Sequence, residues 1–196
     1  MTTVDNTWIL QALQGDMEAF TQLVEAYQRP VFNLCYRMLG DAQEAEDAAQ
    51  ETFWRAYQGM KKYDPSRSFA TWLLSIAAHY CIDQQRKRKL PMVDIDILPE
   101  EDAPDPSPNP EKVISKQMEN RVLHRLLDQL QPQDRAAVIL RYWYEMSEEE
   151  IASTLQLSTS AVKSRLFRAR RQLAEEYESS STSAVLERSP HGTPAI

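Results

Sequence analysis

Apolar residues recur every three or four positions along most of the chain, a spacing that predicts α-helices. In the N-terminal part three such stripes run through residues 20–38, 45–60 and 69–80, and the third continues into the basic run RKRK at 86–89. Pro30 is expected to kink or interrupt the first helix, and Asp41 is placed to cap the second. There are no alternating β-branched runs and only four glycines. We therefore expect an all-α protein.

The C-terminal part is helical in pattern as well. Residues 109–130 predict one helix that begins at an Asn-Pro pair, and Pro132 begins another. The stretch MSEEEIASTLQLSTSAVKSRLFRARRQL then predicts helix, short turn, helix. Ser147 and Glu150 have the S-x-x-E spacing of a capping box, and Ser158 is placed to cap the last helix. A small shared core is expected from Ile151, Leu155, Leu157, Val162, Leu166, Ala169 and Leu173.

A proline-rich acidic segment separates the two helical parts. Residues 91–110 contain six prolines and six acids, which neither propagate a helix nor bury enough apolar area to order the segment. We expect two small helical domains, residues 1–89 and 113–178, a flexible acidic linker over 90–112 and a disordered tail over 179–196. The chain has a net charge of −7, and the linker alone holds seven acids against one base. The acidity is thus local, and it does not exclude nucleic-acid binding.

Several functional classes are disfavoured by the composition. The two cysteines show no CxxC spacing, so neither a disulfide framework nor a metal site is expected. The start MTTVDNTWIL lacks the features of a signal peptide, and no stretch is long and apolar enough to span a membrane. No hydrolase, metalloprotease or phosphate-loop motif is found. We expect a cytoplasmic protein that is not an enzyme and needs no cofactor.

The outward face of the last predicted helix is basic in an otherwise acidic chain. It carries no acid until Glu175 and is formed by Ser160, Lys163, Ser164, Phe167, Arg168 and Arg171, with Arg165 and Arg170 at its edges. A merely solvated face normally mixes both signs of charge. The face also follows a short turn and begins with small hydroxyl residues, as in a DNA-recognition helix. DNA binding is therefore favoured over a solvated surface.

Three motifs in order resemble a known family. The stretch YRMLGDAQEAEDAAQETFWRAY, followed by SFATWLLSIAAHYCIDQQRKRK, resembles region 2 of bacterial RNA polymerase sigma factors. LRYWYEMSEEEIASTLQLSTSAVKSRLFRARRQL resembles their region 4. The arrangement over residues 8–176, with a short linker and neither region 1.1 nor region 3, is that of the extracytoplasmic-function group.

The resemblance implies partners. In this family the helix containing AEDAAQETF docks on the β′ clamp helices of core RNA polymerase, which points here to Glu44, Asp47, Gln50, Glu51 and Arg55. Without the motif, an ordinary charged helix face would be the simpler interpretation. The resemblance also implies contacts with the β flap, with promoter DNA and with an anti-sigma factor that is often membrane-anchored.

The resemblance places the reader of the promoter −10 element in the loop and helix that follow. The implied residues are Lys61, Lys62, Tyr63, Arg67, Ser68, Phe69, His79, Asp83, Arg86 and Arg88. Aromatic and basic side chains suit capture of an unstacked base and of the displaced strand. Trp72 lies on the inward stripe and is expected in the core. His79 stands where relatives usually have Asn, so it is either a sign of altered specificity or a histidine without function.

In region 4 the resemblance assigns base contacts to Thr159, Ser160, Lys163, Ser164 and Arg168. Arg165, Arg170 and Arg171 are better candidates for phosphate contacts. Gln156 occupies a turn position where many relatives have Gly and where φ is often positive. The acidic linker either follows the RNA channel of the polymerase, as in relatives, or is a simple tether.

The sequence thus predicts a sigma factor that binds core polymerase, directs it to promoters and assists melting. One alternative is a helix-turn-helix regulator that binds duplex DNA tightly without polymerase. Another is a sigma mimic that sequesters an anti-sigma factor, against which the basic stripe counts.

Overall fold

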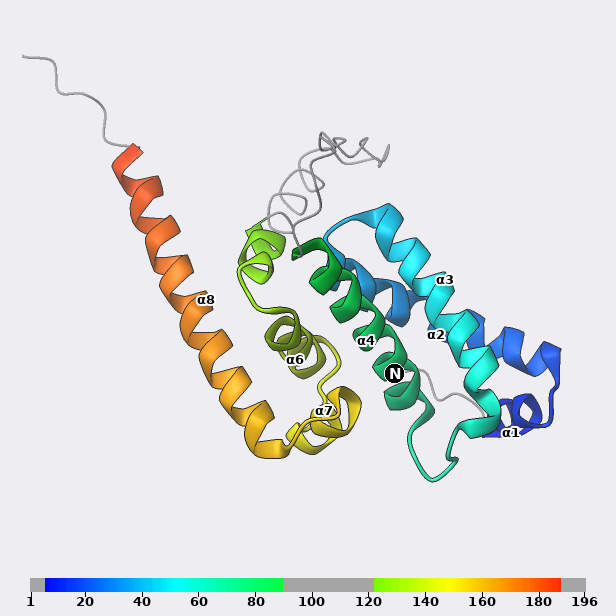
Figure 1. Ribbon diagram of the computed structural model, residues 1–196. Helices are drawn as coiled ribbons and strands as arrows, with labels where there is room; N and C mark the ends of the chain where they lie inside the picture. Colours follow the sequence, from blue (N-terminus) through cyan, green and yellow to red (C-terminus); the bar gives the residue numbers. More distant parts are fainter. Residues whose placement is uncertain (1–5, 90–121, 188–196) are drawn as a thin grey trace, which may run out of the picture.

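The computed structural model describes residues 6–89 and 122–187, and within these ranges it is helical and contains no strand (Figure 1). This confirms the all-α prediction. The elements are α1 (Asn6–Leu13), α2 (Met17–Leu39), α3 (Ala42–Gly59), the 3-10 turn η1 (Met60–Lys62), α4 (Phe69–Lys89), a helical stretch over 122–128, α6 (Pro132–Trp143), α7 (Glu148–Leu155) and α8 (Thr159–Glu187).

Local capping sets the helix boundaries of the N-terminal part. Asp41 accepts a hydrogen bond from the backbone N–H of Glu44 at 2.8 Å and caps α3, as predicted. The preceding helix ends at Gly40, whose φ of 83° is in the left-handed region that glycine adopts without strain. α2 continues through Pro30, so this proline does not interrupt the helix.

Helices α1 to α4 form the first domain. α2, α3 and α4 pack on one another, and α1 lies against α2 (Figure 1). The core combines large side chains from α2 and α4 with alanines from α3, which allow the helices to approach closely. It includes Leu23, Val31, Leu34, Met38, Ala45, Ala48, Ala56, Leu73, Leu74 and Ala77.

The second domain contains the predicted helix-turn-helix. Ser147 accepts from the N–H of Glu150 at 3.1 Å, and the Glu150 carboxylate accepts from the N–H of Ser147 at 2.7 Å, which confirms the capping box. Gln156 caps the C-terminal end of α7, and its φ of 54° confirms the left-handed backbone expected at this position. Ser158 caps α8 through the N–H of Ala161 at 3.2 Å.

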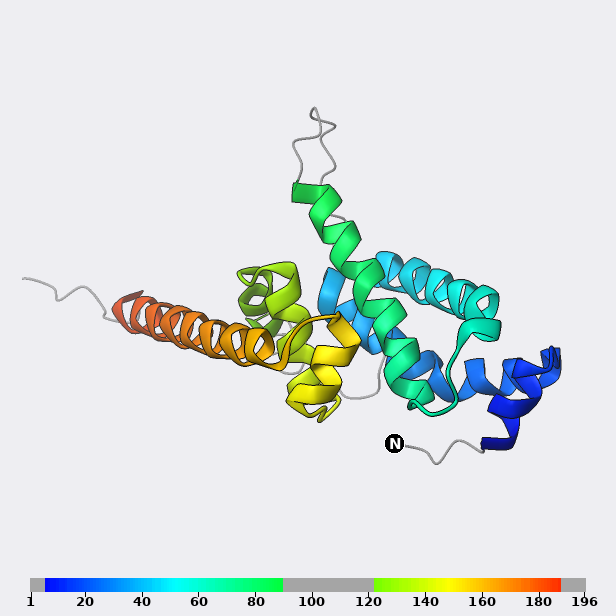
Figure 2. The same cartoon turned by 60° about the horizontal axis from the view of Figure 1, so that its bottom comes forward.

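The two domains pack against each other. α6 contacts α2 and α4, and α7 contacts the first half of α4 (Figure 2). The buried apolar residues of both domains form one continuous cluster. α8 lies on the far side of α6, and its C-terminal half projects away from the molecule (Figure 1).

Two predicted boundaries can be compared with the extent of the described helices. α8 continues to Glu187, beyond the predicted domain end at residue 178. The acidic linker, the Asn-Pro helix start near residue 109 and the last residues of the tail lie outside the described residues. Among the helices of 6–89 and 122–187, none has the length and apolarity needed to cross a bilayer.

Candidate nucleic-acid and polymerase interfaces

The basic face of α8 is exposed. Ser160, Lys163, Ser164, Phe167, Arg168, Arg170 and Arg171 are open to solvent and Thr159 is half-buried, whereas Val162, Leu166 and Ala169 are buried against α6 and α7. The predicted inward and outward positions of this helix are therefore confirmed.

Two cations of this face carry exposed ion pairs. Lys163 Nζ lies 3.5 Å from Glu148 Oε2 on α7, and Arg171 Nε lies 3.3 Å from Glu175 Oε1 one turn further along α8. Solvent-exposed pairs of this kind contribute little and exchange readily. Both cations therefore remain available to an anionic partner.

Arg165 is positioned differently from the prediction. Its Nη1 donates to Asp134 Oδ1 and its Nη2 to Gln133 Oε1, both at 2.6 Å, and its side chain is 23% exposed. Arg168 lies 3.8 Å from the same carboxylate but is 57% exposed. In this conformation Arg165 therefore joins α8 to α6 and is not free to contact a phosphate. Arg168 remains exposed and can contact one.

The aromatic residues predicted to read the −10 element are core residues in this structure. Tyr63 and Phe69 are 6% and 4% exposed, and their rings lie 5.5 Å apart. Tyr27 and Trp72 complete this aromatic cluster, with Trp72 in the inward position predicted for it. Burial raises the pKa of the Tyr63 hydroxyl, and nearby Asp64 raises it further. Neither ring has an exposed face in this conformation, so the predicted stacking on a base requires the cluster to open.

The aromatic cluster instead fixes the loop that carries the predicted basic residues. Tyr63 donates its hydroxyl to the carbonyl of Arg67 at 2.5 Å, and Asp64 accepts from the N–H of Ser66 at 2.9 Å. These hydrogen bonds with Ser66 hold the pKa of Asp64 below its usual value. Lys61, Lys62, Arg67 and Ser68 are exposed around this fixed loop.

The remaining predicted −10 residues lie along α4. The carbonyl of Ser75 can only accept, so His79 Nδ1 donates to it at 2.7 Å, which leaves Nε2 as the second polar atom of this half-buried ring. Asp83 and Arg86 form an exposed pair at 3.8 Å.

Arg88 is ion-paired with Glu44 at the start of α3, and its Nη1 is 3.4 Å from the carbonyl of Leu39. The resemblance predicts a DNA contact for Arg88 and a polymerase contact for Glu44. The structure brings the two together, since α4 ends beside the α2–α3 turn.

The predicted polymerase-binding face of α3 is formed by exposed Asp47, Gln50 and Arg55 and half-buried Glu44 and Glu51. The Arg55 Nε is 2.7 Å from Glu51 Oε1, and its guanidinium lies 4.9 Å from the ring centre of Tyr80.

An apolar groove beside this face was not predicted. It has a volume of about 450 Å³ between α2 and α3 and is lined in part by Val24, Phe32, Gln50 and Phe53.

Two exposed aromatic residues on α3 were also not predicted. Trp54 is 56% exposed and Tyr57 is 40% exposed, with ring centres 6.4 Å apart. Tyr57 falls by its spacing on the apolar stripe of residues 45–60, so the sequence predicts that it faces inward. The sequence does contain a signal for this surface. Trp54 is apolar but lies off the inward stripe, and an exposed apolar residue of this kind is typical of a contact surface.

The geometry defines a protein with a helical domain that carries a basic loop and a second domain that presents a basic recognition helix. Residues 23–90 match the family model for Sigma-70 region 2, and residues 120–173 match that for Sigma-70 region 4.

Relatives cover nearly the whole chain. It is 35% identical over 186 residues to the ECF RNA polymerase sigma factor SigW of Bacillus subtilis, covering 86% of this chain and 94% of SigW. It is 32% identical over 173 residues to the RNA polymerase sigma-H factor of Pseudomonas aeruginosa, covering 85% of this chain and 90% of that protein. The chain therefore belongs to the extracytoplasmic-function RNA polymerase sigma factors, which are promoter-specific initiation factors without catalytic activity of their own.

A solved structure shows the same fold. The structure of CnrH in complex with the cytosolic domain of CnrY superposes with a TM-score of 0.69 at 24% identity, covering 90% of this chain and 99% of that one.

Proposed function

We propose that this protein binds core RNA polymerase through α3, reads the −10 element with the loop before α4 and with α4 itself, and reads the −35 element with the exposed face of α8. The polymerase face is Glu44, Asp47, Gln50, Glu51 and Arg55, supported by the neighbouring apolar groove. Promoter opening takes place where the polymerase works, in the cytoplasm.

The single observation that carries the −35 assignment is the exposed basic face of α8. Its residues Lys163, Ser164 and Arg168 point away from the domain core and follow directly on a capped turn. Side chains at the N-terminal end of a recognition helix reach base edges in the major groove. Arg165 is assigned a supporting role, because it holds α8 on α6.

The −10 assignment rests on the exposed cations Lys61, Lys62 and Arg67, with His79 and Arg86 further along α4. Cations of this kind track the phosphates of a displaced strand. The aromatic cluster beneath them positions the loop. Base capture by Tyr63 or Phe69 would require that cluster to open.

An anti-sigma factor is a further proposed partner. The structural neighbour CnrH is in complex with the cytosolic domain of CnrY. The exposed Trp54 and Tyr57 supply apolar contact area of the kind found at protein interfaces.

Run-off transcription with purified core polymerase tests the proposed function. Start sites that are used only in the presence of the protein, on a library of promoter-length fragments, are the expected result. The double variant Lys163→Glu/Arg168→Glu should lose roughly thirtyfold or more in promoter-dependent initiation, because each of the two lost base contacts is worth about 1–3 kcal/mol. Arg125→Glu, a charge reversal at an exposed position outside α8, is the control.

The result also separates the alternatives. Tight sequence-specific binding to duplex DNA by the protein alone, with no stimulation of the polymerase, would favour a conventional regulator. Unchanged partner binding without any transcription would favour a sigma mimic.

A further inference from the structure

Asp134, in the first turn of α6, lies beside two arginines of the recognition helix α8. Its Oδ1 accepts a hydrogen bond from Arg165 Nη1 at 2.6 Å and lies 3.8 Å from Arg168 Nη2. The side chains of Asp134 and Arg165 are 11% and 23% exposed, whereas that of Arg168 is 57% exposed. One largely buried carboxylate is therefore shared between an arginine that is held inside the domain and an arginine that faces solvent.

A second acceptor completes the hold on Arg165. Gln133 Oε1 accepts from Arg165 Nη2 at 2.6 Å, so both terminal nitrogens of this guanidinium donate to α6. The paired donors of a guanidinium are the groups that bind a phosphate in two places. Because those of Arg165 are bound to Asp134 and Gln133, this side chain has to leave its acceptors before it can bind DNA in this way.

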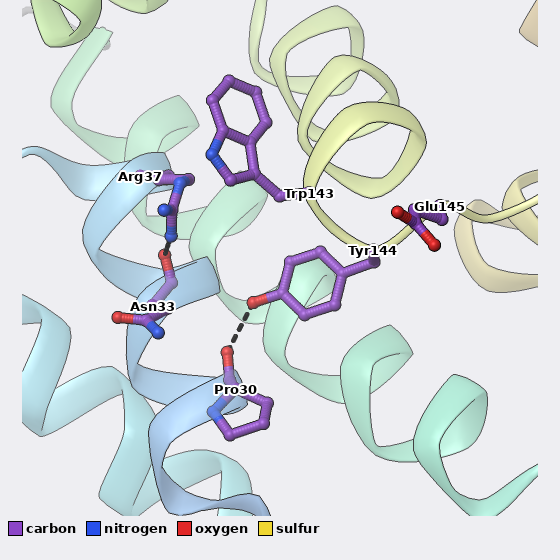
Figure 3. Close-up of a pocket in the computed structure, with 6 residues that line it drawn as sticks. All are labelled: Pro30, Asn33, Arg37, Trp143, Tyr144 and Glu145. Carbon is purple, nitrogen blue, oxygen red and sulfur yellow. Dashed lines mark hydrogen bonds between the residues drawn. The ribbon is translucent and has the colours of Figure 1, made fainter. Parts of the chain in front are cut away.

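The helix that carries these acceptors is itself fixed. Arg141 Nη1, in the last turn of α6, donates at 2.8 Å to the carbonyl of Met146 in the turn before α7. Just after the helix, the Tyr144 hydroxyl donates at 2.5 Å to the carbonyl of Pro30 (Figure 3). Asp134 is therefore presented to α8 from a helix with little freedom to move. The helix is also anchored by a row of buried side chains, Ala136, Ala137, Val138, Ile139 and Leu140.

The arrangement needs only the second domain. Gln133 and Asp134 lie on α6, and Arg165 and Arg168 lie on α8. These two helices pack directly on each other. The pairing therefore does not depend on the position of the first domain, and it is available when α8 approaches DNA.

The two arginines suit different tasks on DNA. Arg168 occupies a position proposed to reach a base edge, and the commonest specific contact in the major groove is an arginine bound to guanine through two hydrogen bonds. That geometry requires a guanidinium that approaches in a defined direction. Arg165, three positions earlier on the same helix, is a phosphate candidate, and a phosphate contact strengthens binding to every sequence alike.

The pairing is strong enough to decide where Arg165 lies. A hydrogen bond to a charged group within a protein shifts an equilibrium by roughly ten- to a hundredfold, whereas a solvent-exposed ion pair contributes roughly fivefold or less. Arg165 is therefore expected to stay on α6 when DNA approaches. The same carboxylate attracts Arg168, and because Asp134 is largely withdrawn from water this attraction is screened less than that between two exposed charges.

We propose that Asp134 is a positioning residue for −35 reading, which keeps Arg165 away from the DNA phosphates and restrains Arg168 for contact with a base. This inference rests on the proposed function of α8 and extends it to a residue outside the recognition helix. Loss of the carboxylate should have two effects. Arg165 should add one phosphate contact, and base discrimination by Arg168 should weaken.

Three variants separate these effects. Asp134→Asn removes the charge and keeps the shape, so both arginines lose their restraint. Gln133→Ala removes only an acceptor of Arg165 and leaves the net charge unchanged. Glu175→Gln is the matched control for charge, because this carboxylate pairs with Arg171 on the same helix at 3.3 Å while both side chains are exposed.

The phosphate contact is measured by salt dependence. RNA polymerase reconstituted from core and each full-length variant is bound to a DNA fragment without a promoter at salt concentrations from about 50 to 200 mM. Each additional phosphate contact steepens the slope of log affinity against log salt by about 0.9. Asp134→Asn is expected to show this increase, Gln133→Ala part of it and Glu175→Gln none. The core polymerase contributes equally to every slope.

The base contact is measured on the promoter identified by run-off transcription. Single base-pair changes through the −35 element reveal the pair whose identity matters to the unchanged protein but not to Arg168→Ala. A bidentate arginine contact is worth roughly five- to a hundredfold of discrimination, and Asp134→Asn should lose roughly two- to tenfold of it at that base pair alone. Gln133→Ala, whose effect is limited to Arg165, should keep full discrimination there.

The results distinguish this inference from the proposed function, with circular dichroism to confirm that each variant is folded. Equal loss at every base pair with an unchanged salt slope would show that Asp134 only stabilises the domain. The same slope change in Glu175→Gln, or its persistence in Asp134→Asn/Arg165→Gln, would show that net charge and not Arg165 is responsible. Either result overturns the inference, while promoter-dependent transcription still supports the proposed function. Absence of such transcription with the unchanged protein would overturn the proposed function and the inference together.

Discussion

Arg165 on α8 and Asp134 on α6 form a bridge of 2.6 Å that fixes the recognition helix to the helix behind it. Both side chains are largely buried, and Asp134 also lies 3.8 Å from the exposed Arg168. Asp134 thus sits between one arginine that holds α8 in place and another that faces outward. The next residue, Arg135, connects the same helix to α2. α6 therefore links the orientation of α8 to the contact between the domains.

Asp134→Ala is expected to destabilise the protein by about 1–3 kcal/mol, because it removes the carboxylate that pairs with the partly buried Arg165 guanidinium. Asp134→Asn keeps an acceptor and should cost less. Urea denaturation followed by circular dichroism measures the difference. Glu175→Ala, which removes the exposed partner of Arg171, is the control and should leave stability unchanged within error. Equal stability of Asp134→Ala and this control would contradict the bridge.

Phe69→Ala is expected to cost about 3–5 kcal/mol of stability, because it empties the centre of the aromatic cluster. Phe167→Ala, the same change at a 62% exposed position, should cost less than about 0.5 kcal/mol.

Phe69→Leu then separates packing from base stacking. It should retain most of the stability and also most of the promoter melting, measured by permanganate reactivity of unpaired thymines. Normal stability combined with lost melting would show that the ring leaves the core and stacks on DNA.

Gln156→Gly is expected to stabilise the protein by about 0.5–1 kcal/mol, because Gln156 has a φ of 54° that only glycine adopts without strain. Gln28→Gly is the same substitution at an exposed position inside α2 and should destabilise by about 1 kcal/mol. Thermal unfolding of the two variants should therefore shift in opposite directions. A loss of stability in both would mean that the Gln156 side chain contributes more than its backbone strain costs.

The contact between the two domains is expected to weaken in acid through His124. Burial is the main reason why the pKa of His124 lies below its ordinary 6.5, and the cations Arg135 and Arg37 lower it further while Asp128 opposes them. The ring packs on Tyr36 across the domain interface. Since the folded protein favours the neutral ring, this contribution is fully present above pH 6.5 and is lost as the pH falls below that value.

The measurement is stability to urea between pH 7.5 and 5.5 in the unchanged protein and in His124→Phe. The phenylalanine variant should lose part of the acid sensitivity. His79→Phe is the control at a histidine outside the interface, and an identical loss in both variants would contradict the assignment to His124.

The sequence by itself determined the helical class, the capping of α3, α7 and α8, and the exposed face of α8. These features depend on local spacing. Helical periodicity, and the side chains that cap free backbone groups, involve residues only a few positions apart in the sequence. The order of the motifs identified the family, which SigW and the two family models confirm.

Only the tertiary structure decided which side chains are available. Tyr63 and Phe69 have the chemistry for stacking but are buried, because the loop folds back over Tyr27 and Trp72. Arg165 has the charge for a phosphate contact but meets a carboxylate 31 positions earlier in the chain.

The sequence does not predict the contact between the two domains, for the same reason. The Tyr144–Pro30 hydrogen bond joins residues 114 positions apart, and no local pattern encodes it. A hydroxyl, a guanidinium or an aromatic ring has the same sequence signature whether it faces solvent or a second domain. Which of these it faces depends on long-range packing, and that packing decides how α4 and α8, the two helices proposed to contact DNA, are placed relative to each other.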